Sequence, residues 1–426
     1  MTRLSARTAY YGSELLLSGG MKAAFTVSAV YFVTDVGMNP FQLVMVGTLM
    51  ELTILLFEVP TGVVADLYGR RLSLVVGWVI FGSGIMLAGS IESVWAVWAG
   101  WVVWGFGYTF TSGAHEAWIT DEVGADRVGV VFARGHQAAN VGGLVGIGVG
   151  VAVASWDLGA ALVVGGGICV LVGLAALVLM PETGWVRPER TEPTAGVAAR
   201  VASVAGQMRS TAGSGVRFVR ARPLLLLILA ITFFAGASTE SYDRLWEAHL
   251  IRDVGLPSLG ALEPVVWFGL LGVVSMLLGI VAAEVVVRRF ERVGQEGLAR
   301  WLLVITVVQV AVVLAFAFAG PFWLAVGAVW AYGLTRSVAA PVSATWLNTQ
   351  ITDSRVRATV ISLNGQSDAL GQILGGPGVG ALGVLVSLRA ALVAGAALLV
   401  PAIGLYARAL RHGGVEPELD ELPAPR

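Results

Sequence analysis

Twelve stretches of mostly apolar residues follow one another along this 426-residue chain. They cover residues 12–33, 41–65, 72–90, 94–118, 134–155, 158–180, 223–251, 262–287, 298–319, 322–350, 356–386 and 388–410. A helix needs about 20 such residues to cross a bilayer. The sequence therefore predicts an all-α membrane protein with twelve transmembrane helices. Only 13% of the residues are charged and the net charge is −1, which excludes a soluble enzyme and a nucleic-acid-binding protein.

One long polar segment divides the stretches into six plus six. Residues 181–222 are rich in Arg, Pro, Thr and Ser, whereas most other connections are short. We expect an N-terminal six-helix bundle at 1–185, a cytoplasmic linker at 186–222 and a C-terminal six-helix bundle at 223–412. The tail at 413–426 is acidic and Pro-rich, so we expect it to be disordered and cytoplasmic.

The arginines between the stretches indicate an orientation. If both termini are cytoplasmic, the cytoplasmic segments hold nearly all of these arginines, and the outer segments hold only Arg252 and Arg389. Basic residues in short loops favour the cytoplasmic side. The sequence therefore predicts a multi-pass protein with both termini in the cytoplasm.

The two halves of the chain repeat each other. Residues 34–38 after the first stretch resemble residues 252–256 after the seventh, and the same offset aligns Lys22 with Glu240. Six spans are an even number, so the two copies have the same orientation in the membrane. Parallel repeats are related by an axis along the membrane normal and enclose a site near the midplane. We therefore expect a central cavity between the halves, with Lys22 and Glu240 facing each other or sharing a partner across it.

The connection between the second and third stretches carries a motif. It reads Gly62-Val-Val-Ala-Asp66-Leu-Tyr-Gly69-Arg70-Arg71, and it resembles the signature loop of the major facilitator superfamily. We expect Asp66 to cap a helix start and pair with Arg, and Arg70 to reach an acid at the inner end of the fourth span. In that family the cluster latches the two halves shut on the cytoplasmic side. The predicted gate residues are Gly62, Asp66, Gly69, Arg70, Arg71 and Asp121, with a degenerate second copy at Glu284, Arg288 and Arg289.

Two further segments look like one branch of that superfamily. Residues 110–122 and 238–247 are similar to the corresponding segments of drug:proton antiporters of the macrolide- and tetracycline-efflux type. The resemblance implies proton-coupled drug efflux across the bacterial plasma membrane by a protein that works as a monomer. The fourth stretch has no Arg and the fifth has no Gly-Pro pair, and in both respects the chain departs from other antiporter branches.

Ionisable residues inside the stretches are candidate functional groups, because each is costly in a membrane unless paired or hydrated. Acidic residues outnumber basic ones in this set, which favours a bound proton or a cationic substrate. The candidates for proton or substrate binding are Lys22, Glu51, Glu116, Glu240, Asp243, Arg244 and Glu247.

The seventh stretch gives the sharpest signal. Its four charged residues have the spacing of one helix face. We expect this face to line a water-filled cavity, with Glu240 or Asp243 taking up the coupling proton. The alternative for Arg244 is a structural ion pair with Glu240 or Asp243.

Three other charged residues each have two possible roles. Glu58, just before Pro60, is a proton site or a partner for backbone groups freed by the proline. Glu116 is a proton relay or one half of an inner gate pair. Arg336 pairs with Asp368 or binds an anionic group.

Drug efflux has three alternatives. The chain could export or import a natural metabolite such as a siderophore, sugar or organic acid. An integral-membrane enzyme would need a nucleophile with a base or a set of metal ligands. One cysteine and four scattered histidines provide neither, so we expect no enzyme, no metal and no cofactor. A membrane sensor would need a larger soluble domain. The expected partners are protons, a small molecule and lipid.

Overall fold

The computed structural model describes residues 3–185, 216–258, 264–290, 294–351 and 356–412. Most of the predicted linker and the whole predicted tail lie outside these ranges. The described elements are helical throughout. This confirms the all-α fold class predicted from the sequence.

The N-terminal half contains seven helices. They are α1 (Ala6–Thr34), α2 (Pro40–Tyr68), α3 (Arg70–Ser90), α4 (Val94–Thr109), α5 (Ala114–Val123), α6 (Ala125–Ala154) and α7 (Leu158–Leu179). The predicted fourth span is divided between α4 and α5, which differs from the single stretch expected at 94–118. The chain turns at Gly113, where φ is +69°, a conformation that glycine adopts at little cost.

The C-terminal half repeats this layout. They are α9 (Pro223–His249), the π-helical turn η1 (Leu250–Val254), α10 (Val265–Phe290), α11 (Gln295–Ala317), α12 (Phe322–Thr349), α13 (Arg357–Leu385) and α14 (Leu388–His412). Within the described ranges, nine helices are long and apolar enough to cross a membrane. The 16-residue α4 together with α12 and α13 completes the twelve predicted spans.

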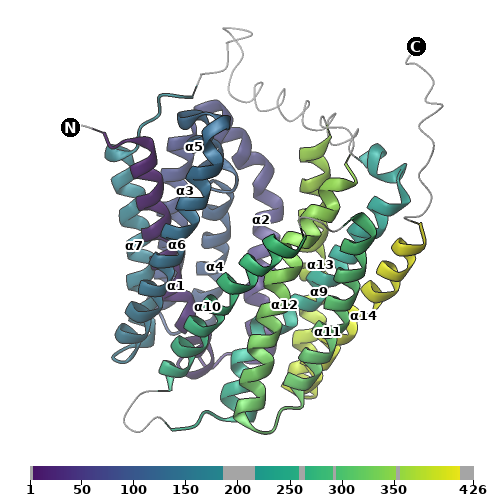
Figure 1. Ribbon diagram of the computed structural model, residues 1–426. Coiled ribbons are helices and arrows are strands. Elements are labelled where there is room, and N and C mark those ends of the chain that lie inside the picture. The colour runs from purple at the N-terminus through teal and green to yellow at the C-terminus, as the bar shows by residue number, and fades with distance from the viewer. Residues whose placement is uncertain (1–2, 186–215, 259–263, 291–293, 352–355, 413–426) are drawn as a thin grey trace, which may run out of the picture.

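Figure 1 shows two bundles side by side, with the start of α1 and the end of α14 at the same side of the molecule. We call this side the terminal side and the opposite one the far side. The internal repeat is visible in the backbone on the far side. Gly37 after α1 and Gly255 after η1 have φ values of +68° and +79°, so corresponding turns end the first helix of each half.

The two bundles meet on the far side. Near the start of α2 and the end of α13, a Cβ added at Gly383 would lie 2.6 Å from Cβ of Pro40. Between α6 and α10, a Cβ added at Gly269 would lie 2.5 Å from Cγ2 of Val151. Toward the terminal side the ribbons of the bundles diverge (Figure 1), and Leu56 of α2 is exposed there. The conformation is therefore closed on the far side.

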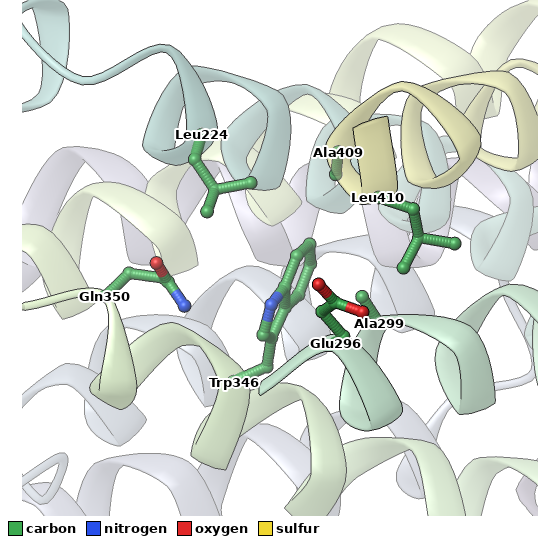
Figure 2. A pocket seen from close by; sticks show the side chains of 7 residues that line it. All are labelled: Leu224, Glu296, Ala299, Trp346, Gln350, Ala409 and Leu410. Atoms are coloured by element: carbon green, nitrogen blue, oxygen red, sulfur yellow. The ribbon is translucent and has the colours of Figure 1, made fainter. Parts of the chain in front are cut away.

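A small hollow lies on the terminal side of the C-terminal bundle, around the indole of Trp346 (Figure 2). Its volume is about 30 Å³, room for little more than one water molecule. Trp346 is 3% exposed and its ring lies 5.6 Å from that of Tyr406. This residue therefore serves packing and does not offer a face to a ligand.

Candidate coupling site on α9

Helix α9 carries four charged residues at the spacing predicted from the sequence. Glu240, Asp243, Arg244 and Glu247 follow an apolar first half of the helix, which begins with Pro223 at its first turn. An unbroken α-helix places residues three and four apart on one face. The structure thus brings all four together, but each has different surroundings.

Glu240 lies in the contact between the bundles. Its side chain is 1% exposed, and Oε1 accepts a hydrogen bond from Nε of Arg244 at 3.1 Å. A Cβ added at Gly47 of α2 would overlap Oε1 of Glu240, and one added at Gly376 of α13 would lie 3.2 Å from its Cγ. The expectation that Glu240 lines a water-filled cavity is therefore wrong for this conformation, because α2 and α13 pack directly against it. The structural ion pair expected as the alternative role for Arg244 is present.

Asp243 binds a different helix. Nη1 of Arg336 in α12 donates to Oδ1 of Asp243 at 2.5 Å, and both side chains keep considerable exposure, at 45% and 36%. The predicted pair between Arg336 and Asp368 is not formed. Oδ2 of Asp368 instead accepts from Nε2 of Gln372 one turn along α13, at 2.9 Å. The rotation of α12 about its axis presents Arg336 to α9.

Glu247 is half-buried, and its Oε2 is enclosed without a hydrogen-bond partner among the described residues. Its electrostatic neighbours are Asp243 and Arg244. An unpartnered carboxylate oxygen in such a place is costly, since buried polar groups are almost always hydrogen-bonded. A proton on Glu247 removes the charge, and this makes the residue a candidate proton carrier.

Glu51 joins the group from the N-terminal bundle. It lies half-buried on α2, with Glu240, Arg244 and Asp368 as its electrostatic neighbours. The cluster thus draws carboxylates from α2, α9 and α13 and guanidinium groups from α9 and α12. We define the coupling cluster as Glu51, Glu240, Asp243, Arg244, Glu247, Arg336 and Asp368. Its carboxylates outnumber its guanidinium groups, and it crosses the junction between the bundles.

Lys22 and Glu116 lie elsewhere. Lys22 is exposed, with its stem beside the position that a Cβ on Gly143 of α6 would take. It forms no ion pair with Glu240, which Arg244 already holds, so the predicted contact between the two aligned residues is not made in this conformation. The repeat places Lys22 and Glu240 at the same depth in the membrane, but it does not fix the direction in which each side chain leaves its helix. Glu116 is exposed on α5 and forms no hydrogen bond through its side chain with any described residue.

His115, the residue next to Glu116, forms polar contacts instead. His115 Nδ1 lies 3.2 Å from Oε1 of Glu14, and its Nε2 lies 3.1 Å from Oγ of Ser13. The ring of Tyr10 lies 4.8 Å from the His115 ring. Glu14 was not among the residues predicted from the sequence, although a carboxylate within the first predicted span meets the same criterion as Glu51.

The signature loop forms a cluster on the terminal side, within the N-terminal bundle. Nε of Arg70 lies 2.9 Å from Oδ2 of Asp121, the acid predicted for it. Asp66 is exposed and has no hydrogen bond or ion pair with a described residue. The expectation that Asp66 caps a helix start is wrong for α3, because Gly69 occupies the N-cap position with φ at +105°.

Glu182, which the sequence analysis missed, takes the capping role. Its Oε1 accepts from the backbone N–H of Arg71 at 2.8 Å, and Nη1 of Arg71 donates to the Met180 carbonyl at 3.1 Å. These contacts join α3 to the end of α7 in the same bundle. The cluster therefore does not latch the two halves together in this conformation.

The second copy of the motif lies on α10. Glu284 is exposed there, one turn before Arg288 and Arg289, whose side chains lie outside the described part of the structure. On the far side, however, an arginine does join the bundles. Nη2 of Arg252 in η1 donates to the carbonyl of Met38 at 2.8 Å.

The described residues contain no group of three or more His, Cys, Asp or Glu that could hold a metal ion. Cys169 is buried in α7.

Two bundles of corresponding helices that meet at a cluster of charges define a secondary transporter fold. The chain belongs to the Major Facilitator Superfamily, whose sequence profile matches residues 13–295. The resemblance of the signature loop to that family is thereby confirmed, and the chain is a multi-pass membrane transporter. No curated protein sequence matches the chain significantly.

Solved structures of low sequence identity share the fold. The nucleoside transporter NupG is 12% identical with a TM-score of 0.73, covering 96% of this chain and all of that one. A bacterial homologue of the human lysosomal transporter Spinster, inward-facing and unoccupied, is 15% identical with a TM-score of 0.72, covering 95% of this chain and 96% of that one. The peptide transporter POT in complex with sulfate has the same identity and TM-score, covering 96% and 95%.

Proposed function

We propose that this transporter exports amphipathic cationic drugs, of the tetracycline or macrolide class, in exchange for protons. The observation that carries the proposal is the excess of carboxylates in the coupling cluster. A membrane-embedded carboxylate without a matched cation needs a proton or a cationic ligand. Exchange of the two at one cluster is the simplest basis for antiport.

Alternating access supplies the second part of the proposal. Glu240 is sealed between α2, α9 and α13 while the far side is closed. Opening the far side moves α2 away from α9 and α13 and exposes the carboxylate to a proton from outside. A proton drives export only if it binds the two conformations with different affinity. The burial of Glu240 in one of them provides such a difference.

The proposed placement is the bacterial plasma membrane, with both termini in the cytoplasm and the protein acting as a monomer. The terminal side is then cytoplasmic, and the described conformation faces inward. The arginines concentrated on that side support this orientation. Drug would enter from the cytoplasm while the far side stays closed.

Sealed inside-out vesicles with an imposed pH gradient test the function. We expect tetracycline or a macrolide to accumulate when the lumen is acidic, and the accumulation to collapse when the gradient is dissipated. Asp126→Asn, on the exposed first turn of α6, is a matched carboxylate control and should transport normally. Gradient-driven movement of a sugar, siderophore or organic acid with no drug transport would favour the metabolite alternative.

A further inference from the structure

An open cavity of about 380 Å³ lies among the helices of the C-terminal bundle, and Arg336 and Asp368 of the coupling cluster line it. It is lined by residues of α9, α11, α12, α13 and α14, and its volume falls within the usual range of small-molecule sites, roughly 300–1,000 Å³. The polar side chains that matter for its chemistry are those of Thr232, Gln309, Arg336, Asn364 and Asp368.

Asp368 is a carboxylate of this cavity that lacks an ion-pair partner among the described residues. It has no basic group within ion-pair distance among the described residues, since Arg336 is held by Asp243. Among the described residues its side chain accepts one hydrogen bond, from the neutral amide of Gln372. A carboxylate in this position attracts a cation, and a desolvated ammonium partner strengthens such a bond.

Neutral groups around Asp368 are suited to hydroxyl groups. Oδ1 of Asn364 accepts from Oγ1 of Thr232 at 2.9 Å, which leaves the two amide protons of Asn364 without a described partner. Gln309 of α11 also lines the cavity, and it forms no hydrogen bond with a described residue. The rings of Tyr332 and Tyr406 supply apolar walls.

We propose that this cavity binds a polyhydroxylated ring compound through its protonated tertiary amine, with Asp368 as the ion-pair partner of the ammonium. The amides of Gln309 and Asn364 bind the hydroxyl groups. A proton replaces the ammonium on Asp368 when the compound leaves, so the charge of the site is balanced in both states. The inference rests on the proposed function, and it names the chemical feature and the residue that select the substrate.

The test compares two ligands on two proteins. Full-length protein in lipid nanodiscs is titrated with tetracycline and with 4-dedimethylaminotetracycline, which lacks the amine, in the presence of EDTA so that no metal complex forms. We expect the wild type to prefer tetracycline and Asp368→Asn to lose that preference by about tenfold or more, as for a hydrogen bond to a charged group. Affinity for the amine-free compound should stay within twofold.

Asp126→Asn is the control, a carboxylate outside the cavity on the exposed first turn of α6. It should keep the wild-type preference. The proposal is overturned if Asp368→Asn retains the preference, if Asp126→Asn loses it, or if the wild type does not bind tetracycline. Thermal unfolding of each variant checks that it folds.

A second variant tests the location. Ser343→Trp fills the cavity from α12 and should abolish binding of both compounds. Unchanged binding would overturn the assignment. The proposed function is tested separately. If binding depends on Asp368 but vesicles show no proton-driven transport, the exchange of drug for protons is contradicted and the binding site still stands.

Discussion

Arg252 and Met38 connect the two bundles where the protein is closed. The Arg252 guanidinium donates to the Met38 carbonyl at 2.8 Å, and Val33 offers a second carbonyl at 3.4 Å. Both acceptors are backbone atoms: the Val33 carbonyl belongs to the last turn of α1, and the Met38 carbonyl belongs to the connection that follows it. The bond therefore fastens one repeat to the other on the far side.

Arg252→Gln should weaken this closure. A hydrogen bond from a charged donor contributes about 1.5–3 kcal/mol, so the ratio of far-side-open to far-side-closed molecules should rise about tenfold or more. Spin labels at Trp156 and Leu385, two exposed far-side positions in different bundles, would report longer distances. Arg389→Gln is the matched control, because Nε of Arg389 donates to the Ala317 carbonyl within one bundle. Equal distance distributions in Arg252→Gln and the wild type would contradict the latch.

Gly47→Ala tests the close approach of α2 to α9. A methyl group there would overlap Oε1 of Glu240 and Nε of Arg244, and the overlap must move the ion pair or the helix. Overpacking of this kind costs about 1–3 kcal/mol, which should appear as a lower melting temperature and a smaller far-side-closed population. Gly148→Ala on α6 is the control, since a Cβ there meets nothing within 4 Å. If both variants have the melting temperature of the wild type, the packing described for Glu240 is incorrect.

The pair of Arg70 and Asp121 is open to a double-mutant cycle. Both side chains are partly exposed, so the coupling free energy should be small, about 0.5–1 kcal/mol. Chemical unfolding of Arg70→Ala, Asp121→Ala and the double variant would give this value, with Arg127→Ala on the exposed start of α6 as the control. Strict additivity would mean that the two side chains do not interact.

The orientation can be tested with cysteines. Cys169 is buried, so it provides a silent background for single substitutions. In intact cells, a membrane-impermeant maleimide should label Trp156→Cys on the far side and leave Asp126→Cys on the terminal side unmodified. The reverse pattern would place both termini outside.

The sequence predicted the helices well because apolar length alone specifies a membrane span. It also predicted the pair of Arg70 and Asp121, because both residues lie at short connections whose positions the helices fix. The partner of Arg336 could not be predicted in this way. Depth along α12 follows from residue number, but the rotation that turns Arg336 toward Asp243 depends on packing among several helices.

Two other errors have the same origin. Lys22 and Glu240 are aligned in the repeat, yet their side chains have different surroundings because the two halves pack against different neighbours. Glu182 lies 111 residues from Arg71, and nothing in either local sequence indicates that α7 ends beside α3. The cavity around Asp368 was missed for a related reason, since it arises from five helices that fail to fill the space between them.

Proton-driven transport by Asp243→Asn and Glu240→Gln tests the central claim most directly. In vesicles with an imposed pH gradient, both variants should lose accumulation of drug against its gradient while still exchanging labelled for unlabelled drug. That result would separate energy coupling from substrate binding. Full gradient-driven accumulation by both variants would contradict the account, because the carboxylates of the coupling cluster would then carry no coupling proton.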